Sequence, residues 1–170
     1  MCFLLYGIDE SIIISIDNNF LGGLHMINKD IRWIQRFESF SKAYNLMRSA
    51  LEEKEIDEFD DLQKEGLVQR FKYTFELLWK TLKDFLENEK VYIDIISPKN
   101  VIKAAATSYL LERMDVDGQI LLDMHEKRNL MSHTYDINKF KETLVKLKKL
   151  YLPEIDKVYD YLLIKRLDNE

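Results

Sequence analysis

The sequence predicts an all-α fold, an up-and-down antiparallel four-helix bundle with one additional short helix. Along most of the chain, apolar residues recur at alternating steps of three and four, the spacing that gathers them on one face of a helix. The 170 residues include only five glycines and two prolines, too few for the turns of a many-stranded β protein. No internal repeat or low-complexity segment interrupts this pattern.

The first two long helices are predicted at residues 30–51 and 61–90. The apolar stripe of the first consists of Trp33, Phe37, Phe40, Tyr44, Met47 and Leu51. The stripe of the second consists of Leu67, Phe71, Phe75, Leu78, Leu82 and Phe85, and Trp79 widens it. The acidic stretch between the two helices, residues 52–61, is predicted to be a solvated helix end and connection.

Three further helices complete the predicted bundle. Ser97 is suited to cap a helix and Pro98 to occupy its first turn, so a short helix is expected from there to about Leu111. A longer helix opens at residues 115–117 and includes residues 128–135. The last helix begins after Asp136, and its stripe consists of Phe140, Leu144, Leu147, Tyr151, Ile155, Val158 and Leu162. Pro153 lies within this stripe and removes a backbone donor, which predicts a kink near Leu150.

The first 25 residues differ from the rest of the chain. Residues 12–14 are three isoleucines, typical of a short β-like run, and the pairs at 18–19 (Asn-Asn) and 22–23 (Gly-Gly) are typical of turns. The predicted domain organisation is therefore an N-terminal extension at 1–25 with no assigned function and a helical domain at 26–170. The extension is interpreted either as a loosely packed arm or as a segment upstream of the natural start.

Composition limits where the protein works and what it binds. The net charge of −5 argues against a surface dedicated to nucleic acid, so any RNA contact requires a local basic patch. The single cysteine, Cys2, cannot form an internal disulfide, which fits a reducing compartment. No apolar run approaches the roughly 20 residues that span a bilayer. The apolar start lacks a basic leader and is followed by Asp9 and Glu10, unlike a secretory signal. A cytoplasmic protein without a membrane partner is expected.

Residues 128–135, RNLMSHTY, contain the side chains best suited to chemistry. The Arg128 guanidinium can bind a phosphate through forked hydrogen bonds, and the His133 imidazole can move a proton near neutral pH. Tyr135 adds a nucleophilic or modifiable hydroxyl. The alternative is a simple helix C-terminus, where Arg128 and His133 favour the negative end of the helix dipole.

Helix geometry makes one copy of this segment an incomplete site. Arg128 and His133 are separated by roughly 140° around a straight helix, so they converge only if the helix opens near Ser132. Asn129 and His133 share a face. Cleavage of a phosphodiester by a neighbouring 2′-hydroxyl needs a base, an acid and a cation. A two-fold homodimer would bring two copies of Arg128 and His133 to one groove, so a homodimer is predicted.

The chain resembles the HEPN superfamily, and within it the nucleotidyltransferase substrate-binding subunits close to the HepT toxins. Residues 128–135 match the superfamily motif of an arginine, four residues, a histidine, one residue and a tyrosine, with an asparagine directly after the arginine. Residues 66–83, GLVQRFKYTFELLWKTLK, resemble the second helix of the family, and Ser97-Pro98 fits the start of its third helix. The resemblance covers about residues 30–163.

This resemblance implies a dimeric bundle encoded beside a minimal nucleotidyltransferase. In the toxin branch such proteins are metal-independent endoribonucleases, and the partner acts as antitoxin by attaching AMP to the motif tyrosine. Carried over to this chain, Arg128 holds the phosphate, His133 is acid or base, Asn129 positions substrate or histidine, and Tyr135 accepts AMP. The alternative is a non-catalytic substrate-binding subunit, as other members are named.

Two sets of cations are weaker candidates for contact with RNA or a partner. The spacing of Arg70 with Tyr73, and of Glu76 with Lys80, is that of simple surface pairs. Alternatively, Arg70 and Lys80 contact RNA phosphate or the motif. The last helix has a basic flank that is either solvated or contacts a phosphate backbone or an acidic partner. Its members are Lys139, Lys141, Lys146, Lys148 and Lys149.

No metal site or cofactor is predicted. His125 precedes His133 by eight residues, about 12 Å along a helix, too far for both to bind one ion. Neither a two-histidine zinc pattern nor a cysteine pair is present. His125 is therefore predicted to be a surface histidine beside Glu126. The chain also lacks a glycine-rich phosphate loop and the paired aspartates of nucleotidyl transfer, so that chemistry is assigned to the partner.

Overall fold

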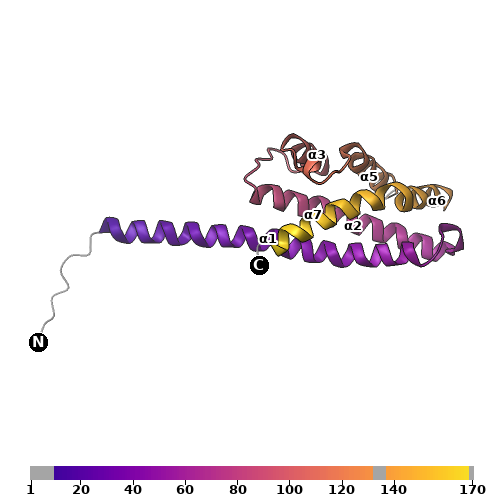
Figure 1. Cartoon of the computed structure of the whole chain (residues 1–170), viewed down its shortest axis with the longest axis horizontal. Helices are drawn as coiled ribbons and strands as arrows, with labels where there is room; N and C mark the ends of the chain where they lie inside the picture. The colour runs from indigo at the N-terminus through magenta and orange to yellow at the C-terminus, as the bar shows by residue number, and fades with distance from the viewer. Residues whose placement is uncertain (1–9, 132–136, 169–170) are drawn as a thin grey trace, which may run out of the picture.

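The computed structural model describes residues 10–131 and 137–168, with side chains for residues 32–131 and 140–168. Within these ranges the chain has no strand, and the predicted all-α helical bundle is confirmed (Figure 1). The long elements are α1 (Glu10–Glu53), α2 (Asp61–Asn88), α5 (Gly118–Leu130) and the pair α6 (Ile137–Lys146) and α7 (Leu152–Leu167). The short elements are the 3₁₀ turn η1 (Ile56–Glu58), α3 (Pro98–Thr107) and α4 (Leu110–Arg113).

Helix α2 is the centre of the bundle, because it packs against α1, α3, α5 and α6. α1 and α2 run side by side, and α7 crosses α1 (Figure 1). The N-terminal half of α1 projects beyond the bundle (Figure 1). In the described part of the chain, no helix has an apolar stretch long enough to cross a membrane.

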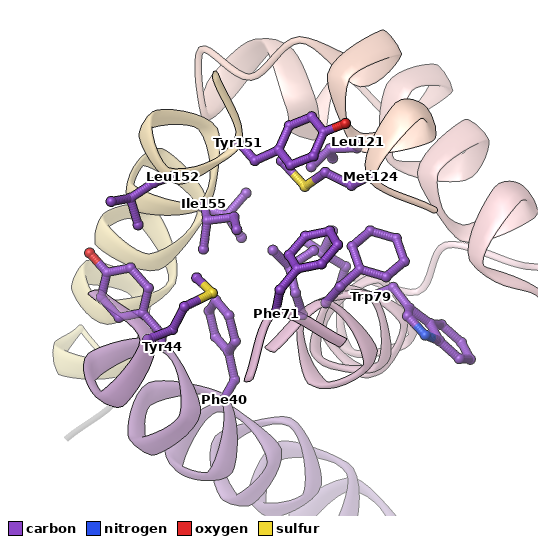
Figure 2. Close-up of a cluster of buried hydrophobic side chains, with 14 of the residues drawn as sticks. Phe40, Tyr44, Phe71, Trp79, Leu121, Met124, Tyr151, Leu152 and Ile155 are labelled. Atoms are coloured by element: carbon purple, nitrogen blue, oxygen red, sulfur yellow. The ribbon is translucent and has the colours of Figure 1, made fainter. Parts of the chain in front are cut away.

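The predicted apolar stripes form the core. Every residue named in the stripes of α1, of α2 and of the last helix is buried. Figure 2 shows side chains from α1, α2, α5 and the last helix converging, with Phe71 of α2 near the middle. The rings of Phe71 and Tyr151 stack at 5.7 Å. The buried stripe of α2 and the buried residues Leu121 and Met124 of α5 pack in one core, so packing fixes the relative positions of α2 and α5.

Side-chain caps set the starts of the helices. Asp60 accepts a hydrogen bond from the backbone N–H of Gln63, whose side chain in turn accepts one from the N–H of Asp60, a capping box for α2. Ser97 accepts from the N–H of Asn100, and Pro98 opens α3, as the sequence predicts. These caps satisfy N–H groups that otherwise lack helical partners.

Before residue 115, two predictions of secondary structure are wrong. The sequence predicts that the short helix continues to about Leu111, but it ends at Thr107 because Tyr109 adopts a left-handed conformation (φ 59°). This reversal turns Leu110 and Leu111 into the core. The β-like run and turns predicted before residue 25 are instead part of α1, which is continuous from Glu10. Extending an existing helix is cheaper than starting a new element, even through Gly at roughly 1 kcal/mol relative to Ala.

Near Leu150, where the sequence predicts a kink, the last helix contains the π-helical segment η2 (Leu147–Tyr151) directly before α7. The N–H of Leu152 bonds to the carbonyl of Leu147, five residues back. Pro153 has no N–H to donate in the turn that follows. The backbone therefore widens where the proline is accommodated, and the apolar stripe continues on both sides.

Candidate functional site

The motif arginine and asparagine lie in the last turn of α5, beside α2. Buried Leu121 and Met124 hold α5 in the core (Figure 2). The N–H of Asp117, the residue before α5, donates to Glu154 of α7 at 2.8 Å, which fixes the start of the helix. α5 ends at Leu130, within the octapeptide that the sequence predicts to be helical throughout. His133 and Tyr135 lie outside the described residues.

Glu76 of α2 joins Arg128 to two further donors. Arg128 Nη2 lies 3.3 Å from Glu76 Oε2, which also accepts from Trp79 Nε1 at 3.0 Å. Glu76 Oε1 lies 2.8 Å from Lys80 Nζ. Trp79 lies at the edge of the core cluster in Figure 2, so its indole can reach this carboxylate. Two cations and one carboxylate from two helices thus meet at the end of α5.

Electrostatics keep this carboxylate ionised. Partial burial pushes the pKa of Glu76 upward, but hydrogen bonds from Lys80 and Trp79 and the charges of Lys80 and Arg128 outweigh it and lower the pKa. The side chains of Arg128 and Glu76 are 34% and 31% exposed, so their ion pair is screened by water and contributes at most about 1 kcal/mol. The pair orients Arg128 more than it stabilises the fold.

Asn129 extends the contacts of Arg128 to a histidine that the sequence reasoning left outside the site. Arg128 Nη1 donates to Asn129 Oδ1 at 3.0 Å, and Asn129 Nδ2 lies 3.3 Å from His125 Nε2. The His125 ring stacks on Phe75, with centroids 6.1 Å apart and an interplanar angle of 24°. The prediction that His125 is a surface histidine beside Glu126 is therefore wrong. The four-residue spacing of His125 and Asn129, which places both on one face of a helix, could have indicated this contact from the sequence.

Comparison with protein families shows which family the chain belongs to. Residues 35–163 match the family described as nucleotidyltransferase substrate binding protein like. The chain belongs to this family. The match extends from the bundle half of α1 into α7 and includes α2, α5 and the motif residues 128–135, so the predicted HEPN-type resemblance is confirmed. Among curated proteins, no match is found.

In this nucleotidyltransferase substrate-binding family member, Lys80 and Arg70 have different surroundings. Lys80 forms the surface pair with Glu76 that the spacing predicts, and the same carboxylate places it beside Arg128. Arg70 does not form the expected pair with Tyr73. Its Nη1 donates to the carbonyl of Leu46 at 2.8 Å, which ties α2 to α1.

Three lysines of the basic flank of the last helix engage carboxylates of the same chain, and Lys149 is exposed. Lys141 Nζ lies 2.6 Å from Asp57 of η1, and its hydrogen bond and charge hold the pKa of that carboxyl below its ordinary value. Lys146 pairs with Asp123 at 3.1 Å, and Lys148 pairs with Glu55 at 2.9 Å. The side chain of Lys139 lies outside the described ones. These pairs favour the solvated, internally compensated interpretation of the flank.

No three acidic, histidine or cysteine side chains within residues 32–131 and 140–168 are grouped as metal ligands. The chemical resources of the described site are the Arg128 guanidinium, the Lys80 ammonium and the polar groups of Asn129 and His125. A guanidinium with a neighbouring ammonium is suited to binding a phosphate.

Proposed function

We propose that this chain is a HepT-like endoribonuclease that needs no metal and acts with a minimal nucleotidyltransferase. The observation that carries the proposal is the meeting of Arg128 and Lys80 at the half-exposed end of α5, five residues before His133 in the sequence. A phosphate at this end of α5 would lie between cations from two helices. The complete arginine–histidine–tyrosine motif of the HEPN resemblance adds the proton-transfer group.

The cleavage step uses the RNA itself as nucleophile. The 2′-oxygen forms a bond to the adjacent phosphorus, the bond from phosphorus to the 5′-oxygen breaks, and the products are a cyclic phosphate and a 5′-hydroxyl. His133 takes the 2′-hydroxyl proton or donates one to the leaving oxygen, and Arg128 stabilises the charge on the phosphorane. In a homodimer, the second His133 performs the complementary transfer.

The partner would silence this activity by modifying Tyr135. The tyrosine oxygen bonds to the α-phosphorus of ATP, pyrophosphate leaves, and the phenolic proton is released. The attached AMP places a phosphate two residues from His133. It would compete with RNA for Arg128 and occupy the groove.

The alternative is a non-catalytic subunit that presents a substrate, or itself, to the nucleotidyltransferase. A specific observation favours it: Lys141, Lys146 and Lys148 are matched by carboxylates of the same chain, which reduces the positive charge that this flank offers to RNA. The net charge of −5 points the same way.

Cleavage of RNA in EDTA separates the two functions. Wild-type protein is incubated with tRNA and with mRNA, beside Arg128→Ala, His133→Ala and a matched control, Arg113→Ala, whose arginine pairs with Glu89 on another surface. We expect wild type and the control to cut, and the two motif variants to lose roughly 100-fold or more in rate. Wild-type protein that cuts no RNA supports the alternative. Cleavage by both motif variants at the wild-type rate refutes the catalytic assignment.

Mass spectrometry tests the modification. The protein is mixed with the neighbour-encoded nucleotidyltransferase and ATP, and intact chains are weighed. We expect one AMP on wild type and none on Tyr135→Phe. Equal modification of both would show that another residue is the acceptor.

A further inference from the structure

We propose that Glu76 and His125 are positioning residues that together fix the plane of the Arg128 guanidinium. They stand at the two ends of a continuous hydrogen-bonded series, Glu76–Arg128–Asn129–His125. Neither end residue belongs to the motif. The inference rests on the proposed function in treating Arg128 as the phosphate-binding group, but the geometry it describes is measurable without RNA.

The direction of each bond follows from the chemistry of the donors. A guanidinium only donates, so the Asn129 atom that faces Arg128 must be the amide oxygen. The amide nitrogen of Asn129 therefore faces His125 and donates to it. His125 Nε2 must then be the acceptor, which places the ring proton on Nδ1.

The opposite tautomer would lose a bond without gaining one. With the proton on Nε2, His125 and Asn129 would direct two donors at each other. His125 Nδ1 is buried and has no hydrogen-bond partner among the described residues, so the alternative gains nothing there. The neutral ring with its proton on Nδ1 is the form that keeps the whole series bonded.

Both ends of the series rest on consecutive residues of α2. The His125 ring stacks on Phe75, which is fully buried, and Glu76 is held by Trp79 and Lys80. Phe75 and Glu76 are fixed because α2 is the central helix of the bundle. Arg128 thus has Nη2 bonded to Glu76 and Nη1 bonded, through Asn129, to His125, and both of these arms rest on neighbouring residues of α2.

Substitution of His125 tests the arm through Asn129. His125→Phe keeps an aromatic ring to stack on Phe75 but removes the acceptor, whereas His125→Gln restores an acceptor near the position of Nε2. We expect His125→Phe to lower kcat roughly tenfold with a smaller change in KM, because a misoriented guanidinium loses contact mainly in the transition state. His125→Gln is expected to recover most of the loss. Equal kcat for wild type and His125→Phe would overturn the proposal, as would an equal loss in both variants with unchanged thermal unfolding.

NMR spectroscopy tests the geometry without reference to activity. At about pH 8, above the ordinary pKa of histidine, long-range ¹H–¹⁵N spectra report which ring nitrogen of His125 holds the proton. We expect Nδ1–H in wild type. We also expect restricted rotation of the Arg128 guanidinium, seen as separate Nη signals, to become averaged in His125→Phe and in Glu76→Ala. The arginine of the Arg113–Glu89 pair serves as internal reference.

The NMR measurements test the positioning role, and the cleavage assay tests the ribonuclease, so each hypothesis can be refuted without the other. An Nε2–H tautomer, or Arg128 signals that are unchanged in both variants, would overturn the positioning role even if wild type cleaves RNA. Wild-type protein that cuts no RNA while the NMR results hold would reject the ribonuclease and leave Glu76 and His125 as residues that orient Arg128.

Discussion

Asp84 is a buried carboxylate, and burial determines how much stability its substitution is expected to cost. The Asp84 side chain is 2% exposed, and it lies within ion-pair distance of Arg32 and Arg36 of α1 and of Lys83 of α2. Lys83 also pairs with Glu87. One buried carboxylate therefore balances cations from the two helices that form the first hairpin.

Asp84→Asn keeps the shape of the side chain and removes its charge. Removing one partner of a buried pair costs roughly 3–5 kcal/mol because the other charge stays buried. Arg32 and Arg36 are 54% and 29% exposed and can regain water, so the cost falls at or below the lower end of this range. We expect the free energy of unfolding to fall by about 2–3 kcal/mol.

Urea unfolding followed by circular dichroism measures this loss. The matched control is Glu52→Gln, which removes a carboxylate that is 58% exposed and paired with Arg48 on the surface. The control is expected to change stability by less than about 0.5 kcal/mol. A loss below about 1 kcal/mol for Asp84→Asn would refute the argument that burial sets the value of this carboxylate.

Three other outcomes are expected. Chains with Arg128→Ala and His133→Ala, inactive alone, should regain activity above either parent but well below wild type when refolded together, because a mixed dimer retains one Arg128 and one His133 in its groove and lacks the histidine for the complementary proton transfer; a mixture as inactive as its parents contradicts a groove in which these two groups act together. The pKa values of Glu76 and Asp123 lie below their ordinary 4.5 and 3.8, so stability is full above those values and should fall as the pH drops through the lowered ones. Urea unfolding across this range should show a shallower decline for Glu76→Gln combined with Asp123→Asn. Gly66 lies within α2, and a methyl group added at its Cα would meet nothing within 4 Å, so Gly66→Ala should raise the free energy of unfolding by about 0.5–1 kcal/mol in the same assay.

The bundle was predictable because its core depends on local periodicity. Each stripe, from Trp33 in α1 to Leu162 in α7, can be identified from three- and four-residue spacing, and all of its members are buried. The break at Tyr109 was not predictable in this way. Nothing in the local sequence requires a left-handed tyrosine, and the conformation accompanies burial of the two leucines that follow, which depends on tertiary packing.

The site was predictable in its composition and not in its contacts. The motif identified Arg128 and Asn129 because their spacing to His133 is a sequence feature. The contact of Arg128 with Glu76 joins residues 52 positions apart, and it depends on how α5 packs on α2. His125 was misassigned for the same reason, since its place against Phe75 is set by tertiary packing rather than by its neighbours in sequence.

The π-helical segment Leu147–Tyr151 has a consequence for how this protein can change over evolution. A π turn holds one residue more than the α turn it replaces, so it uncouples the rotational phase of α6 from that of α7. α6 packs against α2, whereas α7 packs against α1. A single-residue insertion or deletion within the segment can therefore be absorbed there, and either half of the last helix can be lengthened or shortened without rotating the other out of the core.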